Sequence, residues 1–236
     1  MVEYFEKGYH IDRYHSLEED LLSFLDYVTL EFYPKPQNQK YIKSIYLADL
    51  MLRIGSNISV FFDKFIESYA ILGENRLEQI FFAGEESRKI IVELKAIKKK
   101  NSSNPKWQGW NWGDYKKLDT ILALSDKHVL LIPLNQEIYP FKLNGKREGK
   151  AWIDIETGET RFWWGSYNKI KHNAAFKEAN LNNVLHALAA LFLLITTSGS
   201  VDSNKLSQYN YYKRDNRGAI LAFDVSTRLF SRNIWG

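Results

Sequence analysis

The chain has 236 residues, of which 45% are hydrophobic, 25% charged and 15% aromatic, so it is long enough to bury a sizeable core. Its formal charge of +4 is a modest basic excess, and the distribution of the basic residues therefore matters more than their total. The absence of cysteine excludes disulfides, thiolate metal sites and cysteine nucleophiles.

The first quarter of the chain predicts two helices. Ser16-Leu17-Glu18-Glu19 has the form of a capping box, in which a hydroxyl and a carboxylate satisfy free backbone amides, so we expect a first helix over 16–32. A stronger apolar stripe at helical spacing runs from Leu47 to Phe65, with Gly73 as the expected stop. This second helix should be a principal element of the core.

Weaker helical patterns follow over 75–82 and 86–99, and a loop is expected at 101–105. Within the latter pattern, Ile90 to Lys95 also resembles the metal-binding strand of restriction-type nucleases, although the same residues fit an amphipathic helix. A short helical turn is expected at 114–118. These segments continue the helical character of the first half.

The middle of the chain changes character. Four short runs of β-forming residues are separated by Asn-Gly or Thr-Gly turn signals, and they cover 127–134, 139–143, 151–156 and 159–162. We therefore expect a small β-rich insertion over 120–162 within one mainly helical domain that spans 1–236.

Helical character returns over 163–171 and again over 174–197, while 218–235 reads either as two short strands or as a packed extended segment. The longest apolar run, Val184 to Ile195, is too short to span a bilayer. The first residues show no basic region followed by an apolar run. A cytoplasmic protein without a membrane partner is the resulting expectation.

The segment 168–173, Asn-Lys-Ile-Lys-His-Asn, follows an aromatic run and carries the most informative side chains. If it is helical, Asn168 and His172 are four residues apart and share a face, and Lys169 lies three residues before the histidine. An imidazole beside a cation and an amide is suited to proton transfer or to contact with a phosphate. A histidine bonded near a helix end is the plainer interpretation of the same residues.

Two blocks of sequence carry a family resemblance. The first combines Trp163-Trp164, Tyr167-Asn168 and Lys171-His172 with the apolar run that begins at Asn180-Leu181, and the second is the segment 47–56. Together they resemble the HEPN superfamily of helical domains over about half of the chain. The resemblance implies a helical HEPN-like bundle and does not account for the β-rich section. With that section added from the turn signals, the expected fold class is mainly α, a helical HEPN-like bundle with a small β-rich insertion.

Active HEPN domains are metal-independent ribonucleases that usually dimerise, with two motifs facing each other across a groove. The resemblance accordingly implies His172 as general acid or base, Asn168 as a polar helper, and Lys169 and Lys171 as cations for phosphate. The motif's arginine is missing here, because Gly165, Ser166 and Tyr167 occupy the places where it would stand. Lysine carries the charge but cannot make the two-pronged contact of a guanidinium.

A second candidate for RNA contact combines lysines with tryptophans. Lys98, Lys99 and Lys100 precede Trp107 and Trp110, and cations beside rings that stack bases are typical of single-strand binding. The alternative is a solvated helix end followed by core tryptophans, because lysines are also favoured where a helix ends.

The resemblance therefore implies a HEPN-like RNA-binding protein that forms a homodimer, and metal-independent ribonuclease activity of a defence or toxin type is the activity it suggests. No cofactor and no metal are expected, since the sequence shows no phosphate loop, zinc helix or calcium loop. The alternative is a non-catalytic helical module that binds other proteins.

Overall fold

The computed structural model describes residues 9–28, 36–71, 85–101, 103, 114, 117, 119–141, 145–148, 151–154, 163–197, 210–214 and 220–233. The described part is mainly helical, which confirms the expected fold class at that level. Its helices are α1 (Tyr9–Val28), α2 (Pro36–Gln39), α3 (Ile45–Ile71), α5 (Glu85–Asn101), α7 (Asp119–Leu122), α8 (Trp163–Asn173) and α9 (Leu181–Thr197), with short 3-10 turns η1 (Ile132–Leu134) and η2 (Phe176–Glu178).

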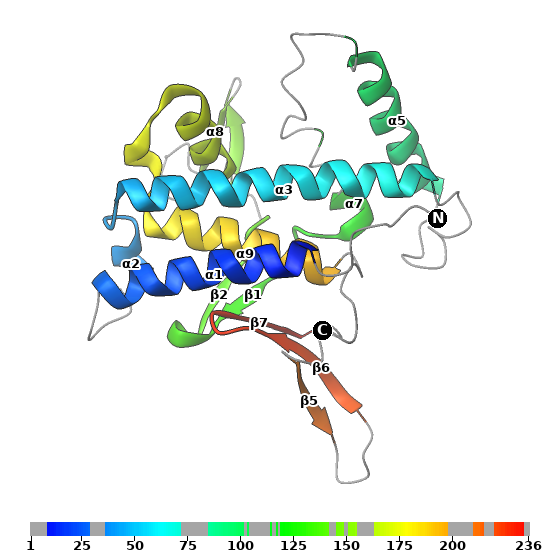
Figure 1. The fold of residues 1–236 in the computed structure, drawn as a ribbon. Coiled ribbons are helices and arrows are strands. Elements are labelled where there is room, and N and C mark those ends of the chain that lie inside the picture. The colour runs from blue at the N-terminus through cyan, green and yellow to red at the C-terminus, as the bar shows by residue number, and fades with distance from the viewer. Residues whose placement is uncertain are drawn as a thin grey trace.

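The core is built where α1, α3 and α9 pack together, with α9 running behind and between the other two (Figure 1). Nearly every residue of α9 from Leu181 to Ile195 is buried, as expected for a helix that is apolar on all sides. α3 instead buries one stripe, which runs from Leu47 to Phe65 as its spacing predicts. These two helices carry many of the buried hydrophobic residues in the described part of the chain.

Two further helices pack against α3 on the side away from α1: α8 over its first half and α5 beside its last turns (Figure 1). α8 approaches closely because Gly55 of α3 has no side chain. A Cβ atom at that position would lie only 2.7 Å from Cγ of Tyr167. The glycine therefore sets the distance between the two helices.

The starts of α3 and α9 lie together at one end of the bundle. Ser44 caps α3 by accepting a hydrogen bond from the amide of Leu47 at 3.2 Å, and Asn180 caps α9 by accepting one from the amide of Asn183 at 2.9 Å. The amide of Leu181 also donates to the carbonyl of Ile42 at 2.9 Å. These bonds tie the segment before α3 to the segment before α9.

The strands form an antiparallel sheet in the order β2-β1-β7-β6-β5 and a separate β3-β4 hairpin. Their bounds are β1 (Val129–Leu131), β2 (Gln136–Ile138), β3 (Gly145–Glu148), β4 (Ala151–Asp154), β5 (Asn210–Arg214), β6 (Ile220–Ser226) and β7 (Phe230–Asn233). Leu130 and Leu131 of β1 pair with Ser231 and Phe230 of β7. The middle strands thus share a sheet with the end of the chain.

Several local expectations differ from the structure. α1 already begins at Tyr9, so Ser16 lies inside the helix and the predicted capping box at 16–19 is wrong. Glu18, which belongs to that sequence pattern, is instead a buried residue on the inner face of α1. α9 begins at Leu181 rather than at 174, because Ala174 takes a left-handed conformation that ends α8. Residues 75–82 and 159–162 lie outside the described part of the chain.

The strand-like alternative for Ile90 to Lys95 is also wrong, because these residues belong to α5. Within α3, Ile45–Phe65 is long and apolar enough to cross a membrane by length and composition alone. Half of this span is buried inside the fold, and a core helix of this kind passes the same test. The apolar character of α3 is therefore accounted for by its packing.

Candidate functional site

The predicted catalytic residues lie on the outer face of α8. The helix buries Trp163, Trp164, Tyr167 and Ile170 against the bundle. His172 is nine residues after Trp163, which is two and a half turns, so it points to the opposite side and is exposed. The buried aromatic stripe thus orients the helix and forces His172 into solvent.

Asn168 and His172 are four residues apart on this helix, so they share a face as expected. Lys169 does not join them. Its ammonium lies 3.5 Å from a carboxylate oxygen of Glu178 in η2, and its side chain is 40% exposed. Lys169 therefore forms a surface ion pair with Glu178 and is not grouped with His172.

The remaining cation of the predicted cluster, Lys171, is exposed, and its ammonium lies 5.6 Å from the centre of the Tyr167 ring. A cation over a tyrosine face is weakly held, which leaves it able to exchange the ring for an anion. We define the α8 outer face as Asn168, Lys169, Lys171 and His172. It offers an imidazole, an amide and the Lys171 ammonium, while the Lys169 ammonium is paired with Glu178.

The α8 outer face adjoins an exposed group of lysines and apolar rings. η2 contacts both α8 and α3, and Lys43 forms an isolated antiparallel bridge with Asn180. The segment 40–46 therefore lies beside the segment that follows α8, at the end of the bundle where α2 and the start of α3 lie in Figure 1. We define the lysine-aromatic end as Lys40, Tyr41, Lys43, Ile45, Phe176 and Lys177, all of which are exposed.

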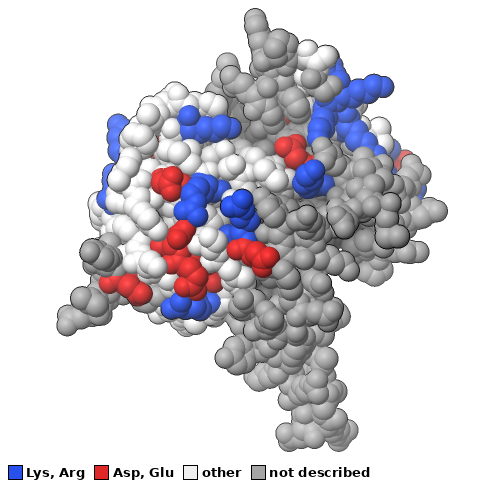
Figure 2. All heavy atoms as spheres, in the orientation of Figure 1, with Lys and Arg blue, Asp and Glu red and all other residues white. Residues whose placement is uncertain are grey.

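The predicted lysine group at the end of α5 is placed elsewhere. Lys99 and Lys100 are exposed and Lys98 is half-buried, and Figure 2 shows a group of basic side chains over this helix. α5 and α8 lie toward opposite ends of α3, so these lysines do not converge on His172 (Figure 1). Trp107 and Trp110 lie outside the described residues.

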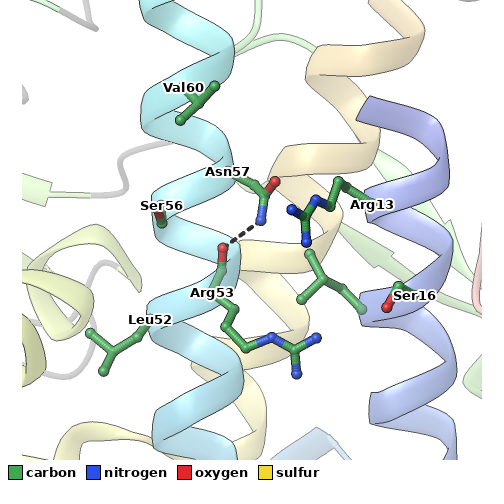
Figure 3. Close-up of a pocket in the computed structure, with 8 residues that line it drawn as sticks. Arg13, Ser16, Leu52, Arg53, Ser56, Asn57 and Val60 are labelled. Atoms are coloured by element: carbon green, nitrogen blue, oxygen red, sulfur yellow. Dashed lines mark hydrogen bonds between the residues drawn. The ribbon is translucent and has the colours of Figure 1, made fainter. Parts of the chain in front are cut away.

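A separate groove of about 360 Å³ runs between α1 and α3 (Figure 3). Arg13 of α1 and Arg53 of α3 extend into the space between the two helices, where Asn57 donates a hydrogen bond to the carbonyl of Arg53 at 2.8 Å. The Arg53 guanidinium lies 2.7 Å from Asp20 and 3.8 Å from Asp49. These carboxylates offset the charge of Arg53, while Arg13 is the second arginine that lines the groove.

The most heavily hydrogen-bonded ionisable group is Glu18, on the inner face of α1. One carboxylate oxygen accepts bonds from the Tyr14 hydroxyl at 3.0 Å, the Thr227 hydroxyl at 2.5 Å and the Leu229 amide at 2.9 Å. His15 faces the other oxygen at 3.7 Å. This cluster joins α1 to the turn between β6 and β7.

Electrostatics agree with a structural role for that cluster. Burial raises the pKa of Glu18, but the hydrogen bonds from His15, Thr227, Leu229 and Tyr14 outweigh it, so the net pKa is lowered. Burial, with the neighbouring carboxylate, raises the pKa of Tyr14 well above 10. The carboxylate of Glu18 therefore stays charged, and the phenol of Tyr14 stays neutral and donates a hydrogen bond to it.

His186 lies on the core helix α9. Burial lowers the pKa of its imidazole to about 4, so it is neutral at physiological pH. The side chain is partly buried rather than fully enclosed. Among the described residues, no group of three or more His, Asp or Glu side chains is arranged to hold a metal ion.

Sequence reasoning missed the lysine-aromatic end and the Glu18 cluster for the same reason. Tyr41 and Phe176 are far apart in the sequence, and so are Glu18 and Thr227. The signal that was available is local: 38–46 contains two lysines and no acidic residue, and Phe176-Lys177 follows the end of α8. No periodic pattern linked these segments.

A scan against protein-family models, a search of curated proteins and a search of solved structures each found no match to this chain.

Proposed function

We propose that this chain is a cytoplasmic, HEPN-like RNA-binding protein whose α8 outer face contacts the RNA and whose His172 acts in metal-independent cleavage, as in a defence or toxin ribonuclease. The observation that carries the proposal is the exposure of His172 on a face that also presents Asn168 and Lys171. A general acid or base must reach its substrate, and an open imidazole meets that requirement.

In the proposed reaction, the 2′-hydroxyl of a ribose attacks the phosphate that joins this ribose to the next nucleotide. A base removes the 2′-hydroxyl proton, the 2′-oxygen bonds to phosphorus, and the bond to the 5′-oxygen breaks while an acid gives that oxygen a proton. The products are a 2′,3′-cyclic phosphate and a free 5′-hydroxyl. Lys171 would offset charge on the phosphate, and Asn168 would donate a hydrogen bond to it.

The attacking 2′-oxygen and the leaving 5′-oxygen lie on opposite sides of the phosphorus, so one imidazole does not reach both at once, and we propose that the protein acts as a homodimer. Two copies of His172 facing each other across a groove would supply the base and the acid. Sedimentation of the full chain is then expected to give a dimer at the concentration of the cleavage assay. A strictly monomeric protein that still cleaves RNA would refute the paired arrangement.

The test of cleavage uses the full chain with a mixed pool of RNA in the presence of EDTA. We expect products that end in a 2′,3′-cyclic phosphate, and we expect His172→Ala to abolish them. His128→Ala is the matched control, because His128 is also an exposed histidine but lies before β1. Equal cleavage by the wild type and His172→Ala would contradict the proposal.

A non-catalytic protein-interaction module is the second candidate, and one observation favours it. Lys169 is paired with Glu178 and Lys171 lies over Tyr167, so neither cation is directed at His172. On this alternative the wild type gives no cyclic phosphate in the same assay, and the α8 outer face binds another protein instead of RNA.

A further inference from the structure

The exposed rings beside α8 differ from the other aromatic side chains at this end of the bundle. Tyr46 packs against α1: its ring stacks on that of Phe24, with 5.6 Å between the ring centres, and its hydroxyl donates to the carbonyl of Asp20 at 3.0 Å. Tyr41 is 71% exposed and Phe176 is 46% exposed. Exposed rings of this size present faces that a flat ligand can cover.

Positive charge surrounds these two rings. The segments 38–46 and 168–181 carry five lysines, Lys40, Lys43, Lys169, Lys171 and Lys177, and their one carboxylate, Glu178, is already paired with Lys169. The Lys40 ammonium lies 5.1 Å from the centre of the Tyr41 ring. The next acidic residue of α3, Asp49, faces Arg53. The surface therefore favours a flat ligand that carries several negative charges.

The position of this surface relative to His172 sets what it can do. Phe176 is four residues after His172, a stretch of chain that spans at most about 14 Å. The left-handed conformation of Ala174, with φ 48°, ends α8 and turns the chain toward η2. η2 contacts α8, so Phe176 lies close to the end of the helix that carries His172. The bridge between Lys43 and Asn180 brings the segment of Tyr41 to the residues that follow η2.

We propose that the lysine-aromatic end binds unpaired bases of single-stranded RNA, with Tyr41 and Phe176 stacking on bases and Lys40, Lys43 and Lys177 contacting phosphates. This inference rests on the proposed function, because it takes RNA as the ligand, and it adds the requirement that the RNA be single-stranded. Bases within a duplex are stacked on each other and cannot cover an exposed ring. Duplex RNA is thereby disfavoured.

Binding is measured by fluorescence anisotropy with a labelled 12-nucleotide 2′-O-methyl RNA of mixed sequence, which lacks the attacking 2′-hydroxyl and so separates binding from cleavage. We expect the single strand to bind more tightly than its duplex. Tyr41→Ala and Phe176→Ala should each weaken binding about tenfold or more, in line with stacking on one base. Tyr41→Trp, which keeps a ring, should retain affinity.

Two further variants complete the design. Lys43→Gln and Lys177→Gln should each reduce the slope of log affinity against log salt by about 0.7, as expected for one phosphate contact to a single strand. Ile132→Ala is the matched control, because Ile132 is an exposed apolar residue in η1 and should leave binding unchanged. Circular dichroism of each variant checks that it is folded.

Each outcome decides the inference. Wild-type affinity in both Tyr41→Ala and Phe176→Ala, or equal affinity for single strand and duplex, overturns it while the proposed function stands on the cleavage assay. A wild type that binds neither nucleic acid overturns both. If Tyr41→Ala converts a dimer into a monomer in sedimentation, the rings form an interface between two copies and the inference is also overturned.

Discussion

The outer face of α8 and the inner face of α1 each present a histidine beside a charged side chain, but the fold uses them differently. Around Glu18, the Tyr14 and Thr227 hydroxyls and the Leu229 amide all donate to one carboxylate oxygen, His15 faces the other at 3.7 Å, and the residue is buried. Around His172, the imidazole is exposed. An ionisable group whose hydrogen bonds are all internal stabilises the fold, whereas one that remains open is available to a ligand.

The largest expected effect comes from the buried member of this comparison. Glu18→Ala leaves the buried Leu229 amide without its acceptor and takes from the Tyr14 and Thr227 hydroxyls the carboxylate oxygen they share, so we expect the free energy of unfolding to fall by about 3 kcal/mol in urea denaturation. Its neighbour Glu19 is the control, since it forms an exposed pair with Arg228 at 2.9 Å. Glu19→Ala should cost less than about 1 kcal/mol. Equal losses in the two variants would refute the structural role of Glu18.

The second prediction concerns how α8 is held against α3. Gly55→Ala places a methyl group against the buried Tyr167 ring, and we expect a loss of about 1–3 kcal/mol even though alanine is the better helix former. Ser56→Ala on the exposed side of the same helix should change stability by less than about 0.5 kcal/mol. Stabilisation by Gly55→Ala would mean that α8 packs farther from α3 than described.

The third prediction is a pH dependence that originates in the core. The folded-state pKa of His186 is about 4, below the value near 6.5 expected when the chain is unfolded. As pH falls below 6.5, His186 becomes protonated in the unfolded chain but stays neutral in the folded chain, so the free energy of unfolding decreases. Because the side chain is partly exposed, we expect a loss on the order of 1–2 kcal/mol between pH 7 and 4.5.

His186→Gln removes the titrating group and should flatten that part of the curve. Glu18 contributes to the pH dependence of stability at lower pH, because its pKa is lowered in the folded chain. Its stabilising contribution is fully present above the unfolded-state pKa near 4.5 and is lost as pH falls through the folded-state pKa. An identical loss in the wild type and His186→Gln between pH 7 and 4.5 would assign the dependence to other groups.

The smallest expected effect lies at the end of α8. Ala174 holds a left-handed backbone, φ 48°, that favours glycine, so Ala174→Gly should raise stability by about 0.5–1 kcal/mol in thermal unfolding. Ala175, with φ −79°, has no such preference, and Ala175→Gly should not stabilise. A loss of stability in Ala174→Gly would show that the strain at this turn is offset by other contacts.

The helices that the sequence predicts best are those whose signal lies within a few turns of one segment. The apolar stripe of α3, the pattern of α5 and the continuous apolar run of α9 each reflect burial along a single helix, and all three are present. The shared face of Asn168 and His172 belongs with them, since a spacing of four residues follows from helical geometry alone. By contrast, the motif at 16–19 predicted a helix start that lies inside α1, because a motif of four residues does not show how far a helix extends before it.

What only the tertiary structure decided is which distant segments meet. The pairing of β1 with β7, the contact of Glu18 with Thr227, and the position of the segment around Tyr41 beside the segment around Phe176 all join residues separated by about a hundred positions or more. Such contacts depend on packing of the whole chain, and no local pattern encodes them. The sequence by itself thus determined a mainly helical protein in which Asn168 and His172 share a helix face, and the fold decided that this histidine is exposed and what surrounds it.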